Sequence, residues 1–337
     1  MRVKRIAWID TVRGIAFLCI IYHHLEGSCP LFFFPQIDMW YTPFYLSLFF
    51  LISGYLFKSE ESFTKVFEQR TRTLLWPLLS LGSLMIIAQH IFTFRDEPIP
   101  WSKGFAGLLF QNGENRILWF VGALYLFSLL FYWINRWAGK KILYASFFLY
   151  FLNWIYTYVF NGVSLPWSLE TVGYGCAYMG LGRVLKCHQD TILPLIKKYW
   201  VACLCVYIII IIFTKESCSF YASPYLFDSF LLSVLGLIIV IGIATIPIVE
   251  KSKYLIFIGS NTLFYFAFHG KVLGAIALLV KSILSHFLLR DIFVINLCAG
   301  FICTVLSSII LIFPTVFVNK YMPWIFGKDF KLWKMNR

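Results

Sequence analysis

Charged residues are scarce in this sequence. Only 13% of the 337 residues are charged, and just 16 are acidic. A soluble domain contains about 25% charged residues, so this scarcity excludes an ordinary soluble globular protein. The sequence instead contains long apolar runs, such as residues 207–213 and 231–249. Because a helix of about 20 apolar residues crosses the roughly 30 Å hydrocarbon layer, the sequence predicts an all-α, polytopic integral membrane protein.

About ten transmembrane helices are expected, and an even number leaves both termini on the same side. The expected helices cover residues 6–25, 41–57, 74–94, 117–134, 142–160, 169–182, 199–213, 225–249, 254–280 and 292–318. With the termini in the cytoplasm, 21 of the 29 Lys and Arg residues fall in cytoplasmic segments and 6 in outer segments. Lysine and arginine accumulate on the cytoplasmic side, so this count supports both cytoplasmic termini. The net charge of +13 is thus explained by topology, and we expect no nucleic-acid partner.

Other features are missing too. No small-residue cleavage site follows the first apolar segment, which argues against a removable signal peptide. No long polar segment would form a soluble domain, so we expect a single transmembrane domain over residues 1–320 and a short basic cytoplasmic tail over 321–337.

Only Cys29 and Cys218 fall in outer segments, and their pairing stays open. We expect no metal site and no permanently bound cofactor. The expected outer loop 95–116 has room for a short re-entrant or interfacial piece.

The first expected helix nevertheless carries Asp10, Arg13, His23 and His24. A central Arg or Asp costs about 2.5–3.5 kcal/mol on insertion, whereas each Leu or Ile contributes only about 0.3–0.6 kcal/mol. At 100° per residue, Asp10, Arg13 and His24 lie on one face of a helix and His23 flanks it. This stripe must therefore face other helices or water. It is either an Asp–Arg pair that supports the bundle or a catalytic stripe, and both alternatives remain open.

A second group of polar residues is expected near the outer face. The predicted orientation brings His24, His269, Glu170 and Asp228 to that side, with Trp119 at the outer start of a helix. Such a cluster is suited to a general base and to ligands for a hydroxyl-rich substrate. Each residue alone also fits an ordinary polar contact between helices.

Arginines precede the third expected span on the cytoplasmic side. The segment "FTKVFEQRTRTLLWP" contains Lys65, Arg70 and Arg72. In a typical membrane protein these residues are a positive-inside anchor. The functional alternative is a phosphate clamp, because guanidinium groups match phosphate oxygens.

Several motifs together resemble the membrane-bound acyltransferase 3 family, in particular its polysaccharide or fucose O-acetylase-like members. The motifs are "IDTVRGIAFLCIIYHH", "SLFFLISGYLF", "FEQRTRTLLWP", "LWFVGALYLFSLL" and "IGSNTLFYFAFHG". The first looks like the family's Asp-x-x-Arg followed eleven residues later by His, so the resemblance assigns functional roles to Asp10, Arg13 and His24. One departure concerns the family's Arg-x-x-Arg: counting from Arg70, the second position here is Thr73, and Arg72 lies one residue away.

The resemblance implies transfer of an acyl group, usually acetyl, from cytoplasmic acyl-coenzyme A to a sugar hydroxyl. The expected partners are acyl-coenzyme A as donor, a surface polysaccharide or lipid-linked glycan as acceptor, and the lipid bilayer. His24 would act as general base or carry the acyl group, and the sequence leaves these two roles open. Arg70 and Arg72 would bind the donor, while Trp119, His269, Glu170 and Asp228 would border the acceptor.

Two alternatives belong to other classes, and one of them is a purely structural or sensing membrane protein. A transporter or flippase for a polar lipid-linked sugar would use the same stripe to line a translocation path. For either function we expect a multi-pass protein of the cell membrane, which in a bacterium is the plasma (inner) membrane.

Overall fold

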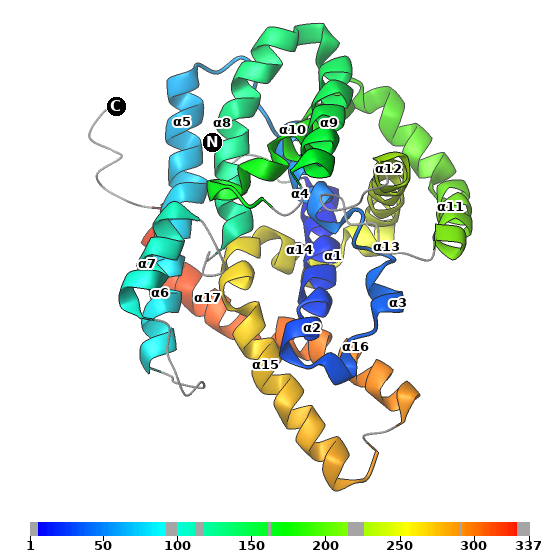
Figure 1. The fold of residues 1–337 in the computed structure, drawn as a ribbon. Coiled ribbons are helices and arrows are strands. Elements are labelled where there is room, and N and C mark those ends of the chain that lie inside the picture. The colour runs from blue at the N-terminus through cyan, green and yellow to red at the C-terminus, as the bar shows by residue number, and fades with distance from the viewer. Residues whose placement is uncertain are drawn as a thin grey trace. The chain divides into compact units, whose positions relative to one another are not determined.

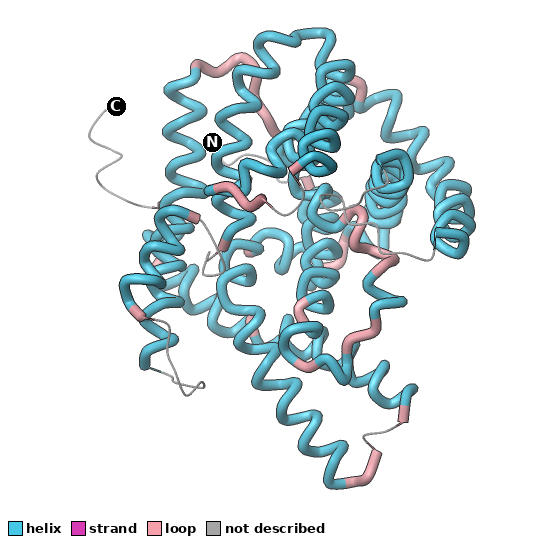
Figure 2. The backbone as a smooth tube through the Cα atoms, viewed as in Figure 1, coloured by secondary structure: helices cyan, strands magenta, loops and turns pink. Residues whose placement is uncertain are grey.

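A computed structural model describes residues 6–91, 100–111, 118–160, 163–214, 226–289 and 292–328. These ranges consist of helices and short connections, with no strand among them (Figures 1 and 2). The chain divides into two compact units. The first comprises Met1–Ile52 and Leu185–Phe313, and the second comprises Ser53–Val184 and Pro314–Arg337.

The first unit contains the amino-terminal helix and most of the carboxy-terminal half of the chain. Its elements are α1 (Ala7–His23), α2 (Leu25–Ser28), a 3-10 turn (Pro30–Phe32), α3 (Pro35–Asp38), α11 (Gln189–Thr214), α12 (Leu226–Ala244), α13 (Pro247–Glu250), α14 (Lys253–Ser260), α15 (Thr262–His286) and α16 (Phe293–Ile310).

The second unit contains the middle of the chain. Its elements are α5 (Phe63–Arg70), a π-helical segment (Thr71–Leu75), α6 (Trp76–Ile91), α7 (Trp101–Phe110), α8 (Trp119–Ala138), a 3-10 turn (Gly139–Lys141), α9 (Ile142–Val159) and 3-10 segments Pro166–Thr171 and Pro323–Phe326. Three helices cross the division between the units, namely α4 (Tyr45–Tyr55), α10 (Val172–Cys187) and α17 (Ile312–Tyr321).

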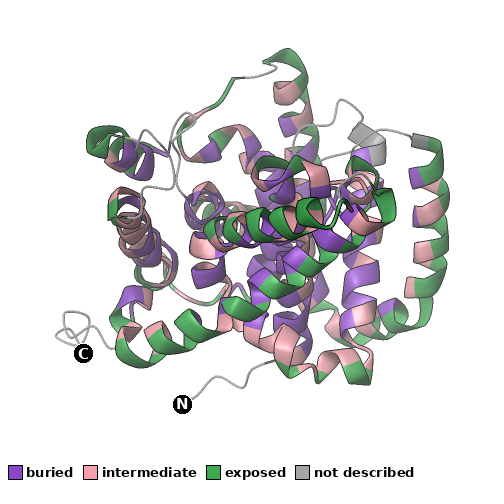
Figure 3. Cartoon of the chain, turned by 90° about the horizontal axis from the view of Figure 1, so that it is seen from below, coloured by how far each residue is buried: buried purple, intermediate pink, exposed green. Residues whose placement is uncertain are grey.

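Five helical stretches of the described chain are long and apolar enough to cross a membrane: Phe63–Ile91, Trp119–Val159, Gln189–Phe213, Thr262–His286 and Phe293–Tyr321. Two shorter apolar helices are Tyr45–Tyr55 and Ser229–Ala244. Many large apolar side chains of the described helices are exposed, for example Phe148, Ile212 and Phe313. Figure 3 marks the exposed positions of the helices in green. Such surfaces suit a lipid environment, so the chain is an all-helical membrane protein. The count of ten spans and the cytoplasmic termini stay predictions.

Some expected helix boundaries were wrong. The expected helix 254–280 is two helices, because the chain turns at Asn261 between α14 and α15. The expected helix 292–318 is likewise interrupted at Leu311. There Pro314 has no N–H to donate to the carbonyl of the residue four positions earlier. The helix expected at 199–213 begins ten residues earlier, at Gln189. The segment 95–116, expected as an outer loop, contains a short helix, α7.

Helix α1 is the core helix of the first unit. It packs against α12, α14, α15 and α16, and Val12, Ala16, Phe17 and Ile21 are fully buried along it. A helix with two charged side chains is thereby shielded from lipid on most sides, as the insertion cost requires.

The contact between α1 and α14 is a close approach of backbones. A Cβ atom at Gly14 would overlap the carbonyl oxygen of Leu255, and one at Gly259 would overlap the carbonyl oxygen of Asp10. Small residues allow helices to pack this tightly in membranes. The glycine of the "IGSN" motif therefore brings the end of α14 against the first turn of α1.

Candidate active site

Asp10 and Arg13 form an ion pair on the first turns of α1. Arg13 Nη1 lies 3.8 Å from Asp10 Oδ1. The Arg13 side chain is 28% exposed and the Asp10 side chain is 11% exposed. The residues are three apart in a helix, which is the spacing at which side chains meet. The predicted pairing is thus present, and it lowers the cost of holding both charges within the bundle.

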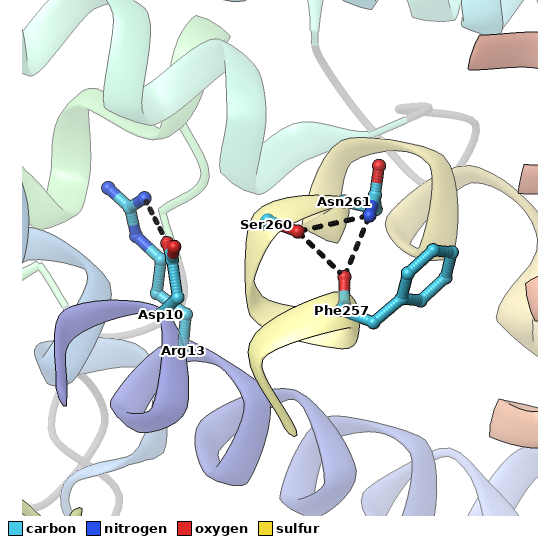
Figure 4. A network of polar contacts seen from close by, with 5 residues as sticks. All are labelled: Asp10, Arg13, Phe257, Ser260 and Asn261. Carbon is cyan, nitrogen blue, oxygen red and sulfur yellow. Dashed lines mark hydrogen bonds and ion pairs between the residues drawn. The ribbon is translucent and has the colours of Figure 1, made fainter. Parts of the chain in front are cut away.

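The turn between α14 and α15 lies beside this ion pair (Figure 4). The Asn261 side-chain amide donates to the Phe257 carbonyl oxygen at 2.8 Å and to Ser260 Oγ at 3.1 Å. Ser260 Oγ donates to the same carbonyl at 3.1 Å. These bonds satisfy a carbonyl at the end of α14, so the "GSN" motif shapes the turn that meets α1.

The other end of α1 brings two predicted residues together. The ring centroids of His24 and His269 are 4.7 Å apart, with an angle of 58° between the ring planes. His24 is exposed at the end of α1, whereas His269 is buried within α15. Phe17 packs edge-on against His269 at a centroid distance of 5.5 Å. Two histidines that the sequence predicted for one cluster are therefore neighbours.

His269 uses only one of its ring nitrogens. Its Nδ1 donates to the carbonyl oxygens of Tyr265 at 2.9 Å and Phe266 at 3.1 Å. With the proton assigned to Nδ1 by these acceptors, Nε2 carries a lone pair. That Nε2 atom is buried and has no hydrogen-bond partner within the described residues. A buried acceptor without a donor is costly in a purely structural role, so it marks a place where a ligand or reacting group can bind.

His23 has a carboxylate partner that the sequence did not indicate. Its Nδ1 lies 2.7 Å from Oδ1 of Asp38, the last residue of α3. The only available signal was an acidic residue within an expected connecting segment. Burial of Asp38 alone would raise its pKa, but interactions with neighbouring side chains, first among them the hydrogen bond with His23, together outweigh burial, and the pKa lies below its ordinary value. Sequence periodicity had given His23 only a flanking position.

The two predicted donor-binding arginines lie where α5 joins α6. Arg70 is the last residue of α5 and is half-buried, and Arg72 is exposed within the π-helical segment Thr71–Leu75. A π-helical turn inside a longer helix is uncommon and frequently occurs at functional sites. It also changes the angular spacing of residues, so the 100° per residue of an α-helix does not describe the directions of Arg72 and Thr73.

A carboxy-terminal segment packs beside these arginines. The Trp76 indole donates to the Trp324 carbonyl oxygen at 2.8 Å, and Ser80 Oγ donates to the Ile325 carbonyl oxygen at 2.8 Å. Gly327 packs so closely that a Cβ atom there would overlap the Arg72 carbonyl oxygen. The start of the expected tail thus holds the π-helical segment in place.

The remaining predicted residues have separate surroundings. Trp119 is the first residue of α8 and packs edge-on against Phe120 at 6.0 Å. Glu170 accepts a hydrogen bond from the Leu165 N–H at 3.1 Å, which gives its carboxylate a local structural role. The side chain of Asp228 and all of Cys218 lie outside the described residues. Cys29 is buried.

No group of three potential metal ligands occurs among the described residues. Histidine, cysteine and carboxylate side chains do not cluster there in the numbers that a closed metal site needs.

Comparison with known families gives one match. A family model described as an acyltransferase domain, that of the acyltransferase 3 family, matches residues 6–313. The match includes α1, His24 at its end, and the chain through α16. No curated protein and no solved structure matches the chain.

Proposed function

The chain belongs to the acyltransferase 3 family of membrane acyltransferases, and we propose that it moves an acetyl group from cytoplasmic acetyl-coenzyme A to a sugar hydroxyl. The acceptor in this proposal is a surface polysaccharide or a lipid-linked sugar, and the protein acts in the cell membrane. His24 is the residue on which the transfer depends.

One observation carries the proposal. His24 is exposed at the end of α1, directly beside the buried His269 whose Nε2 has no partner among the described residues. A reactive imidazole next to an unused acceptor is an arrangement for proton or acyl transfer. Arg13 lies eleven residues earlier on nearly the same face, which is about 16 Å along the helix axis.

The donor would be recognised by Arg70 and Arg72, with Lys65 as a further cation. Two guanidinium groups can form charge-assisted hydrogen bonds with phosphate oxygens, and both arginines occur at the start of a long apolar helix. Arg72 is exposed, so its guanidinium is accessible to a phosphate. The ion pair of Asp10 and Arg13 supports the helix that carries His24.

The acceptor would bind near His24. We assign its hydrogen bonding to His269. Trp119 belongs to the other unit and stays a separate candidate for stacking, because a tryptophan face can cover the apolar side of a sugar ring. Neither assignment involves a metal or a permanently bound cofactor. Acetyl-coenzyme A is a donor substrate in this proposal.

The test uses purified protein in lipid nanodiscs with radiolabelled acetyl-coenzyme A and a panel of glycans. We expect label in the glycan with the wild type and at least a 100-fold lower rate with His24→Ala, since acid–base catalysis contributes about 10²–10⁴-fold. His286→Ala, an exposed histidine at the end of α15, is the matched control and should retain the wild-type rate.

Two results would contradict the proposal. Full transfer by a folded His24→Ala protein would exclude His24 as the reactive group. Movement of a lipid-linked sugar across proteoliposomes without consumption of acetyl-coenzyme A would instead favour a transporter or flippase.

A further inference from the structure

The two histidines at the end of α1 differ in their partners. His23 Nδ1 is 2.7 Å from Asp38 Oδ1, and its side chain is 26% exposed. His24 has no hydrogen-bond or ion partner within the described residues; its nearest rings are those of His269 at 4.7 Å and His23 at 5.9 Å. Adjacent residues of one type thus have distinct surroundings.

The carboxylate that holds His23 is itself held. The Thr42 hydroxyl lies 3.0 Å from Asp38 Oδ2 and 2.5 Å from the Asp38 carbonyl oxygen. The Asp38 side chain is only 10% exposed. A buried carboxylate with two sets of contacts has little freedom to turn away, so it fixes the orientation of the His23 ring.

This orientation determines which nitrogen of His23 can react. A carboxylate that accepts the Nδ1 proton leaves the lone pair on Nε2, and it stabilises the imidazolium that forms when Nε2 takes a second proton. Covalent catalysis of this kind uses a nucleophile, a neighbouring base and a third group that orients the base. His23 has the carboxylate, whereas His24 has none within the described residues.

His269 is less suited to this role than His23. Its Nδ1 donates to two neutral carbonyl oxygens, and the residue is buried. Backbone carbonyls supply no opposite charge to an imidazolium. His269 can position the His24 ring, but it has no counter-charge for a proton taken from a substrate.

We propose that His23, oriented by Asp38, is the general base and acid for the acceptor hydroxyl, while His24 carries the acyl group. This inference rests on the proposed function. An acylated His24 cannot act as the base for its own deacylation, so a neighbouring base is required. The geometry provides one at the adjacent residue.

The transfer is balanced in two steps. First, a His24 ring nitrogen attacks the thioester carbonyl carbon; the N–C bond forms, the C–S bond breaks, and the His24 proton goes to the departing sulfur. Second, the sugar hydroxyl attacks the acyl carbon while His23 Nε2 takes its proton. The O–C bond forms, the N–C bond breaks, and His23 returns the proton to His24.

The experiment measures acylation and transfer separately in nanodiscs with radiolabelled acetyl-coenzyme A. Asp38→Asn and His23→Gln should lower kcat for glycan transfer at least 100-fold, with KM for acetyl-coenzyme A within twofold of wild type. Both proteins should accumulate label on His24, located by peptide mass spectrometry. Asp190→Asn removes an exposed carboxylate from the first turn of α11 in the same unit and should leave kcat unchanged.

A conservative variant separates positioning from folding. Asp38→Glu keeps a carboxylate and should recover at least tenfold of the rate lost in Asp38→Asn, even if both variants melt at the same lowered temperature. Equal rates in Asp38→Asn and Asp38→Glu would overturn the proposal, because a merely structural role would not distinguish charge from amide.

The remaining outcomes separate this proposal from the proposed function. Wild-type kcat in His23→Gln, or no label on His24 in any variant, would overturn the present inference while glycan acetylation by the wild type stands. Absence of transfer by the wild type would instead refute the proposed function.

Discussion

His24 and His269 lie with their ring centroids 4.7 Å apart, although one follows the first helix of the chain and the other lies within α15. The pairing joins an exposed imidazole to a buried one. Hydrogen bonds from His269 Nδ1 to backbone carbonyls hold the buried ring, so its free Nε2 has a defined position. This pair is the structural basis for the predictions about catalysis.

We expect His269→Ala to lower kcat/KM for glycan acetylation about tenfold, the equivalent of one hydrogen bond of roughly 1.4 kcal/mol. The physical reason is loss of the Nε2 acceptor beside His24. Initial rates with labelled acetyl-coenzyme A provide the measurement, and His286→Ala is the control. An unchanged kcat/KM in His269→Ala would show that the buried acceptor has no part in the reaction.

Removal of the ion pair on α1 should affect stability. Arg13→Gln leaves the Asp10 carboxylate without its cation, at a cost of about 1–3 kcal/mol. We expect a lower melting temperature in nanodiscs, and partial recovery in the double variant Asp10→Asn/Arg13→Gln, because no unbalanced charge remains. If the double variant melts below Arg13→Gln, the pair does not act through charge balance.

Gly259→Ala tests the close approach of α1 and α14. The added methyl group would overlap the Asp10 carbonyl oxygen, so overpacking should destabilise the protein by about 1–3 kcal/mol. Gly274→Ala is the matched control, because no atom lies within 4 Å of its Cβ position and alanine favours a helix. Thermal unfolding of both variants decides the matter; equal melting temperatures would contradict the tight contact.

Neutral replacements of the two arginines test donor binding. Arg70→Gln and Arg72→Gln should each raise KM for acetyl-coenzyme A about tenfold, since a charge-assisted hydrogen bond contributes about 1.5–3 kcal/mol. Lys140→Gln, an exposed cation in the turn before α9, should leave KM unchanged.

A truncated donor sharpens the same test. S-Acetylpantetheine lacks the nucleotide, so it should be used equally by the wild type and both arginine variants. A similar loss with both donors would assign the arginines to folding of the π-helical segment and not to phosphate binding.

The apolar runs allowed the fold class and most helices to be predicted, because crossing a bilayer imposes a length and a composition. Interruptions within runs were harder to predict. The turn at Asn261 depends on side-chain bonds to Phe257 and Ser260, and the break at Leu311 depends on Pro314. Neither changes the hydropathy of its run, so a count of apolar residues does not reveal it.

Parts of the candidate site were predictable for a local reason. The pairing of Asp10 with Arg13 follows from their spacing, since a helix brings residues three apart together. The selection of His24 over His23 came from the same helical geometry and from the motif. That geometry gives the direction of each side chain around the helix axis. It cannot identify residues of another helix that contact those side chains.

The sequence by itself determined that α1 has a polar face with Asp10, Arg13 and His24, because covalent geometry and helical periodicity settle which side chains share a face. Only the tertiary structure decided what surrounds the end of that helix. It brings His269 to His24 and Asp38 to His23. The physical reason is that these contacts depend on the packing of α15 and on the path of the chain through α3, which no local pattern specifies.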